Sequence, residues 1–101
     1  MFDVVREALV STIRPWRIVA FGSQARGEAR RDSDLDLIVV ADLEGSLGKR
    51  TGAVRRQLRQ LGVPLDVLVY GREEYERLRT WSSSLPAIAE REGVVLYERA
   101  A

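Results

Sequence analysis

The chain has 101 residues, enough for one small core, so residues 1–101 are expected to form a single domain without room for a second. It contains neither cysteine nor histidine, which excludes disulfides, thiolate or imidazole metal sites and any catalytic scheme that needs a histidine base. The 16 basic and 15 acidic residues nearly cancel, which argues against direct nucleic-acid binding because such proteins usually carry a strong basic excess.

The first part of the chain predicts a helix and two strands. Apolar residues recur at helical spacing over residues 2–13, and Pro15 ends this helix because the residue before a proline avoids the helical conformation. A strand is predicted over residues 17–21, and a short helix over residues 24–29. The second strand, residues 35–40, is apolar on both faces after its second residue, as in a central strand covered by helices on both sides.

The rest of the chain continues this alternation. An apolar stripe predicts a helix that Ser46 caps and Gly62 ends. Arg55, Arg56 and Arg59 lie off that stripe and are interpreted as a solvated face. Later patterns predict a strand over residues 63–70, a helix over residues 73–79, a helix from Ser84 to Gly93 and a strand over residues 94–97. We therefore expect an α/β or α+β domain, with helices packed against a sheet.

A glycine–serine pair and two aspartates stand out between the first two strands. Gly22 lets the backbone approach a ligand without a Cβ, and Ser23 can cap a helical turn whose free N–H groups form an anion site. Asp34 and Asp36 are two residues apart at a strand's start, so they project from one face. A hard divalent cation that also binds phosphate would relieve their repulsion. The pattern predicts metal-assisted chemistry on a nucleotide; the alternative is a solvated turn, with Ser23 only a helix cap.

A third carboxylate, Asp66, lies between apolar neighbours in the predicted strand over residues 63–70. A charge inside a strand is costly unless it is paired or bound to a metal. If this strand lies beside the second one, Asp66 can face the same site as Asp34 and Asp36. Otherwise Asp66 is an acid at a strand edge that pairs with an arginine.

Several other residues have two possible interpretations. Arg26 is either a phosphate contact or the salt-bridge partner of a neighbouring acid. Trp16 and Trp81 are interpreted as core or interface residues, and Asp42 as a plain loop acid.

The stretch GSQARGEARRDSDLDLIVV, residues 22–40, resembles the signature of the polymerase-β-type nucleotidyltransferase superfamily. The matching pattern is Gly22-Ser23, ten residues, then Asp34-x-Asp36. The full sequence of residues 22–40, and the sequence REGVVLYE over residues 91–98, are similar to those of minimal nucleotidyltransferases, which are often paired with HEPN-domain proteins. The resemblance covers nearly the whole chain and implies the polymerase β-like fold, a small mixed β-sheet with helices packed against it.

The same resemblance implies a reaction and its residues. The implied reaction moves a nucleoside monophosphate, AMP from ATP, to a hydroxyl and releases pyrophosphate. In HEPN pairs such relatives act as antitoxins, so the implied acceptor is a tyrosine of a HEPN toxin partner. The implied residues are Asp34, Asp36 and Asp66 as catalytic ligands of two Mg²⁺ ions, and Gly22, Ser23 and Arg26 as contacts of the nucleotide triphosphate.

Two other functions stay open. The chain could neutralise a partner by contact alone, or transfer a nucleotide to a small molecule such as an aminoglycoside, although it lacks a second domain to form an acceptor pocket. No apolar run approaches the ~20 residues of a membrane span, and the N-terminus does not read as a signal peptide, so a cytoplasmic location is expected. The sequence does not indicate an oligomeric state.

Overall fold

The structure is a computed structural model, and it describes residues 2–22, 35–62 and 65–100. The predicted bounds of the first helix and the first two strands are confirmed, and the other predicted elements agree with the structure to within two residues. The short helix expected over residues 24–29 lies outside the described residues. In chain order the elements are α1 (Phe2–Ile13), β1 (Arg17–Phe21), β2 (Leu35–Val40), α2 (Leu47–Arg59), β3 (Leu65–Tyr70), α3 (Arg72–Leu78), α4 (Leu85–Glu92) and β4 (Val94–Glu98).

The four strands form one mixed sheet in the order β3-β2-β1-β4. Strand β1 pairs antiparallel with both β2 and β4, whereas β2 and β3 are parallel. Parallel strands require a long connection, usually a helix that packs on the sheet, and α2 provides it here. The prediction of a small mixed sheet with helices packed against it is therefore confirmed.

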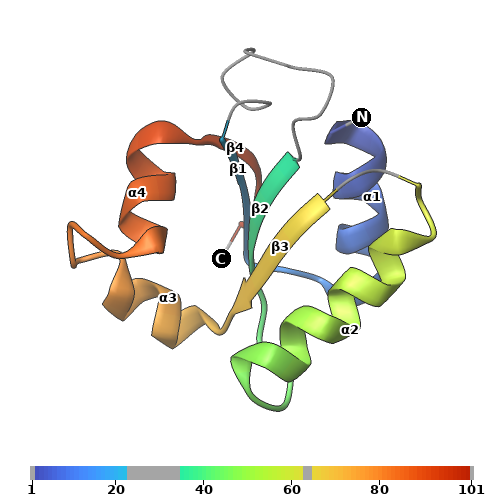
Figure 1. The fold of residues 1–101 in the computed structure, drawn as a ribbon, viewed down its shortest axis with the longest axis horizontal. Coiled ribbons are helices and arrows are strands. Elements are labelled where there is room, and N and C mark those ends of the chain that lie inside the picture. Colours follow the sequence, from blue (N-terminus) through green and yellow to red (C-terminus); the bar gives the residue numbers. More distant parts are fainter. Residues whose placement is uncertain (1, 23–34, 63–64, 101) are drawn as a thin grey trace.

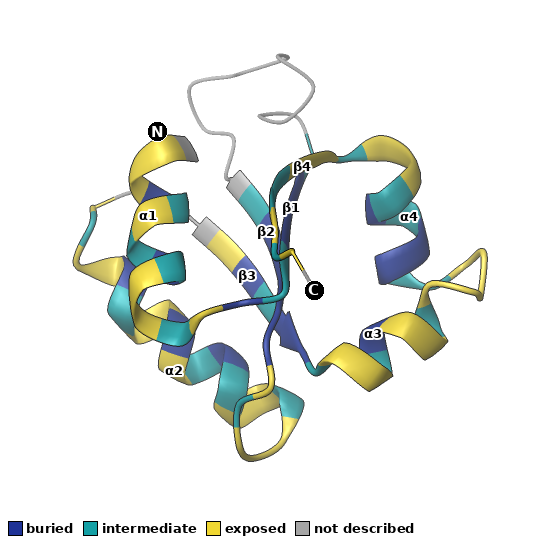
Figure 2. Ribbon diagram, turned by 180° about the vertical axis from the view of Figure 1, so that it is seen from behind, coloured by how far each residue is buried: buried dark blue, intermediate teal, exposed yellow. Residues whose placement is uncertain are grey.

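Helices α1 and α2 cover one face of the sheet, and α3 and α4 cover the other (Figure 1). The structure has two hydrophobic cores, one on each face of the sheet, and alternate residues of β2 pack into each. Leu37 and Val39 pack with α1 and α2, whereas Ile38 and Val40 pack with α3 and α4. All four are at most 2% exposed. Figure 2 shows the buried residues gathered along the strands and on the inner sides of the helices. This two-sided burial confirms the prediction of a central strand.

Helix α2 is fixed to the outer edge of β3 by two polar side chains. Thr51 Oγ1 accepts a hydrogen bond from the Val69 N–H at 3.1 Å, and Arg50 Nε donates to the Val69 carbonyl at 3.3 Å. Arg50 also forms an ion pair with Glu74 at 2.7 Å. Because these bonds satisfy an edge residue of the sheet, they block that position against pairing with another strand and fix the position of α2 along β3.

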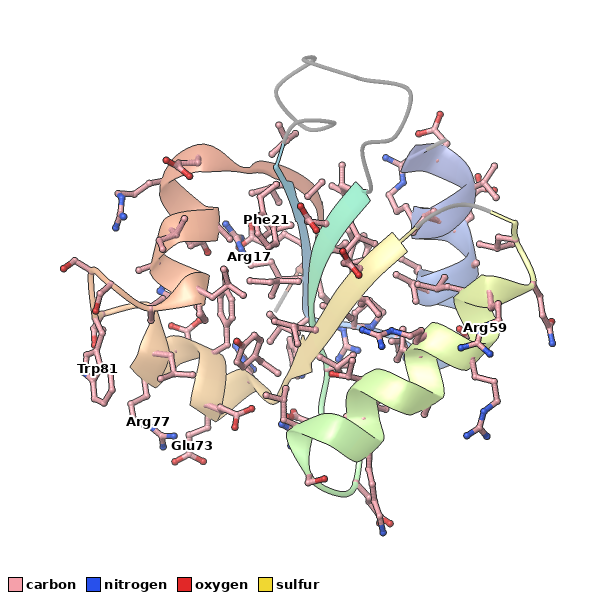
Figure 3. The ribbon with its side chains drawn as sticks, viewed as in Figure 1. Arg17, Phe21, Arg59, Glu73, Arg77 and Trp81 are labelled. Atoms are coloured by element: carbon pink, nitrogen blue, oxygen red, sulfur yellow. The ribbon has the colours of Figure 1, made fainter. Side chains whose placement is uncertain are left out.

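A half-buried network fixes α3 and α4 on the other face. Arg17 Nη2 and the Tyr75 hydroxyl each donate to the Glu90 carboxylate at 2.9 Å, and Figure 3 shows Arg17 pointing from β1 toward this helical layer. Burial alone would raise the pKa of Glu90, but the hydrogen bonds from Arg17 and Tyr75 outweigh it and hold that pKa below its ordinary value. Burial and the hydrogen bond to Glu90 raise the pKa of Tyr75.

Trp16 joins the segments at the end of the sheet where β1 begins. Its N–H donates to the Val40 carbonyl at 2.6 Å, its carbonyl accepts from the Arg99 N–H at 2.9 Å, and its Nε1 donates to Asp42 Oδ2 at 3.1 Å. Asp42 Oδ1 also accepts from the Arg72 N–H at 3.0 Å. The interpretation of Asp42 as a plain loop acid is therefore wrong. Trp81 is 60% exposed and is not a core residue.

Two glycines provide a matched test of packing. An added Cβ at Gly93 would lie 2.5 Å from the Ala89 carbonyl oxygen and 2.7 Å from that of Ala20, whereas one at Gly52, inside α2, would meet nothing within 4 Å. Gly93→Ala should lower the free energy of unfolding by about 1–3 kcal/mol, because those backbone atoms must move apart. Gly52→Ala should raise it by about 0.5–1 kcal/mol, because alanine loses less entropy in a helix. Urea unfolding measures both, and equal stability of the two variants would contradict the packing described for Gly93.

Candidate functional site

Two aspartates lie side by side at one end of the sheet. Asp36 of β2 and Asp66 of β3 are register partners in the parallel pair, so they occupy neighbouring strands that in general lie about 4.8 Å apart. Alternation along each strand places both carboxylates on the face of Ile38 and Leu68, which pack against the α3–α4 layer. Asp66 is exposed and Asp36 is half-buried. The strand of Asp66 therefore lies beside the strand of Asp36, as the sequence interpretation required for the two residues to face one site.

Gly22 brings the backbone close to one of these two carboxylates, that of Asp36. It follows β1, whose last residue, Phe21, is the antiparallel partner of Asp36. Gly22 has a φ of +92°, and a Cβ added there would collide with Asp36 Oδ2. Only glycine fits both the backbone conformation and the close approach. Of the six predicted site residues, the structure therefore brings Gly22, Asp36 and Asp66 together; Ser23, Arg26 and Asp34 lie outside the described residues.

A cavity of about 370 Å³ opens beside the two carboxylates. Its volume is at the lower end of the range for small-molecule sites. Apolar side chains from three elements wall it on the α4 side, namely Phe21, Leu68 and Leu85, so a ligand held there would have one polar and one apolar surface. Figure 3 shows Phe21 on β1 within the space between the sheet and α4.

Arg55 is a lining residue of this cavity that the sequence interpretation missed. The helical pattern places it off the apolar stripe of α2, together with Arg56 and Arg59, and all three are exposed. Its place in the lining of the cavity separates Arg55 from Arg56 and Arg59, and no local pattern in the sequence indicates that difference. Arg55 adds one positive charge to this lining, and Asp36 and Asp66 add two negative ones.

The donor set fits a hard divalent cation. The acidic side chains that line the cavity are those of Asp36 and Asp66. Within the described ranges, no group of three or more acidic, histidine or cysteine side chains could hold a metal ion. Both offer carboxylate oxygens, the ligands that Mg²⁺ prefers, and exposure leaves room for water or phosphate oxygens to complete the coordination. Asp34 is two residues before Asp36 in the sequence and is the candidate for a third ligand.

Comparison with known proteins identifies the class. A model of the nucleotidyltransferase domain matches residues 3–96, which contain nearly all of the sheet and its helices. The chain therefore belongs to the nucleotidyltransferase domain family and is an enzyme of that class. It is 30% identical over 81 residues to "Putative protein adenylyltransferase MJ0604" of Methanocaldococcus jannaschii, a match that covers 80% of this chain and 77% of that protein.

Three crystal structures share the fold at lower sequence identity. The first, a putative nucleotidyltransferase from Sulfolobus solfataricus, has a TM-score of 0.62 and 24% identity, covering 97% of this chain and 77% of that one. The second, a toxin–antitoxin with AMP-PNP, has a TM-score of 0.67 and 17% identity, covering 97% and 73%. The third, a mutant of the toxin–antitoxin MntA-HpeT, has a TM-score of 0.62 and 14% identity, covering 98% and 74%. These likenesses confirm the predicted nucleotidyltransferase fold.

The contact between Gly22 and Asp36 predicts the effect of a methyl group. Gly22→Ala should reduce transferase activity at least about tenfold, because the new Cβ displaces the Asp36 carboxylate from its position beside Asp66. Gly62→Ala is the matched control: Gly62 also has a positive φ, +69°, but an added Cβ meets nothing within 4 Å. Both variants should lose about 1–2 kcal/mol of stability from backbone strain. Initial rates of nucleotide transfer, measured below the unfolding temperature of both variants, test this. An equal loss of activity in the two would assign the effect to strain and contradict the role of the contact.

Proposed function

We propose that this nucleotidyltransferase transfers AMP from ATP to a hydroxyl group of a protein, and that the hydroxyl belongs to a tyrosine of a HEPN toxin that the transfer inactivates. The observation that carries the reaction is the register of β2 and β3, which sets Asp36 beside Asp66 next to the close approach of Gly22. Asp34, Ser23 and Arg26 complete the proposed site on the sequence pattern. ATP is available in the cytoplasm, where we propose that the protein acts.

Because the chain has no histidine, the proton acceptor must be a carboxylate or a metal-bound group, and we propose a carboxylate. The acceptor oxygen forms a bond to the α-phosphorus, the bond from that phosphorus to its bridging oxygen breaks, and pyrophosphate leaves. Asp66, the more exposed of the two described carboxylates, takes the hydroxyl proton. The three aspartates would hold two Mg²⁺ ions, which when bound neutralise the charge that develops on the phosphate oxygens. Positioning and charge neutralisation account for most of such a reaction.

The proposed acceptor is supported by the relatives and by the shape of the site. The M. jannaschii relative is named as a putative protein adenylyltransferase, and two of the structures with the same fold are toxin–antitoxin complexes, one of them with an ATP analogue. The sequence resemblance supplies the HEPN identity of the toxin. Phe21, Leu68 and Leu85 give the cavity an apolar wall that suits an aromatic acceptor side chain.

A contact antitoxin without catalysis and a small-molecule transferase are the competing functions. Neither is favoured by an observation on the described residues. A contact antitoxin would not need a glycine where a Cβ meets Asp36. The three functions predict different outcomes when a labelling assay is combined with an assay of protection against the toxin.

Transfer of label from α-labelled ATP to proteins of the native cell extract, in the presence of Mg²⁺, tests the proposed function. Wild type should label one protein band of toxin size, on tyrosine. Asp36→Asn and Asp66→Asn should each reduce the labelling rate about 100-fold or more, because each removes a carboxylate from the reacting centre. Glu44→Gln is the control, since Glu44 is an exposed loop acid away from the cavity, and it should label at the wild-type rate.

The other outcomes exclude the proposal in different ways. Label on a small molecule instead of a protein would establish the third function. Protection against the toxin that persists in Asp36→Asn would establish the contact antitoxin. Label on serine or threonine would support transfer of AMP to a protein and would exclude tyrosine as the acceptor.

A further inference from the structure

Helix α2 carries an excess of positive charge that the rest of the chain does not share. Among its 13 residues are five basic ones and no acidic one. Since the whole chain has 16 basic and 15 acidic residues, the remainder has more acids than bases. A solvated helix surface typically alternates charges of both signs. Positive charge is instead concentrated on this one helix.

Three of these bases form one surface, Arg55, Arg56 and Arg59, which we call the α2 arginine face. All three side chains are exposed. Arg59 lies four residues after Arg55 and three after Arg56, and residues at these spacings are neighbours on the surface of a helix. The buried residues of α2 lie on another side of the helix, toward the sheet. The α2 arginine face is therefore directed outward.

The described part of the chain does not neutralise this face. No carboxylate within it forms an ion pair with Arg55, Arg56 or Arg59, whereas Arg50 of the same helix pairs with Glu74. Like charges at these spacings repel each other and destabilise a helix. The helix dipole favours basic residues in the last turn, which accounts for Arg56 and Arg59 but not for Arg55. An acidic surface placed against the three arginines would relieve their repulsion.

The α2 arginine face is continuous with the candidate active site. Arg55 lines the cavity together with Asp36 and Asp66, and Arg56 and Arg59 are not among the described residues of that lining. The face therefore begins at the cavity and extends away from it over the last turn of α2. A protein whose hydroxyl enters the cavity has to contact the surface around its mouth. The α2 arginine face is part of that surface.

We infer that the α2 arginine face is the docking surface for an acidic patch of the acceptor protein and guides the acceptor hydroxyl to the cavity. The inference rests on the proposed transfer to a protein. Complementary charges of this kind speed the encounter of two proteins and fix their orientation. A nucleic-acid strand needs basic side chains along an extended track. One helix, in a chain whose remainder has an excess of acids, does not provide such a track.

Initial rates of AMP transfer test the docking surface. The acceptor is the protein that wild type labels in the native cell extract, purified, and the rates give separate KM values for this acceptor and for ATP. In Arg56→Gln/Arg59→Gln the KM for the acceptor should rise about tenfold at about 0.1 M salt, with the KM for ATP unchanged. At about 1 M salt, where the screening length falls to about 3 Å, the difference from wild type should shrink to about twofold or less.

The double variant Arg77→Gln/Arg91→Gln is the matched control. It also removes two exposed arginines, from the last turns of α3 and α4, and neither has an ion-pair partner among the described residues. Figure 3 shows Arg59 on α2 and Arg77 on α3, at opposite sides of the sheet. Because the control changes the net charge equally but away from the cavity, its KM for the acceptor should equal that of wild type. Circular dichroism checks that both double variants are folded.

The other results overturn the inference. A KM for the acceptor that is unchanged in Arg56→Gln/Arg59→Gln, or that rises equally in the control, would show that the face does not dock the acceptor. A loss that persists undiminished at high salt would exclude charge as its cause, and an equal rise in the KM for ATP would place the two arginines at the nucleotide. A short single strand of nucleic acid that competes with the acceptor for wild type would assign the face to that polymer. All of these leave the proposed transfer intact, whereas an extract in which wild type labels no protein would remove both proposals.

Discussion

The parallel register of β2 and β3 is the constraint on which the rest of the structure depends. It sets Asp36 opposite Asp66, and a shift of one residue would turn one of the two carboxylates to the other face of the sheet. Helix α2 holds this register from outside, because Thr51 and Arg50 bond both backbone groups of Val69. The same helix brings Arg55 to the cavity beside the aspartates. Fold and candidate site are thus fixed by one pair of strands and the helix that connects them.

Burial on both faces explains why charge is found at the two ends of the sheet. The middle of β2 packs against helices on either side, so a charge there would have to be desolvated. Asp36 and Asp66 lie near the start of their strands, and Asp42, which accepts a hydrogen bond from the Trp16 indole, lies beyond the end of β2. Charged side chains therefore lie at both ends of the sheet, and the cation of the proposed reaction would be bound at the end where Asp36 and Asp66 lie.

Local patterns in the sequence predicted the elements well, because proline, glycine and capping serines mark most boundaries; Ser46 and Ser84 both accept the expected capping hydrogen bonds. Gly22 was predicted to permit a close approach, and the group it approaches is Asp36. What the sequence could not provide was contact between distant segments. Arg55 has the same local pattern as Arg59, and only the folded structure distinguishes them, because Arg55 lines the cavity and Arg59 does not. Asp42 holds Trp16 from 26 residues away, which no local pattern indicates.

We infer that Asp36 and Asp66 act on the same cation. Electron paramagnetic resonance of free Mn²⁺ measures its binding to wild type, Asp36→Asn, Asp66→Asn and the double variant. Each single variant should bind Mn²⁺ about tenfold or more weakly, and the double variant should be little worse than the weaker single one, because ligands of one ion are energetically coupled. Unchanged affinity in either single variant, or losses in the two that simply add, would contradict a shared cation.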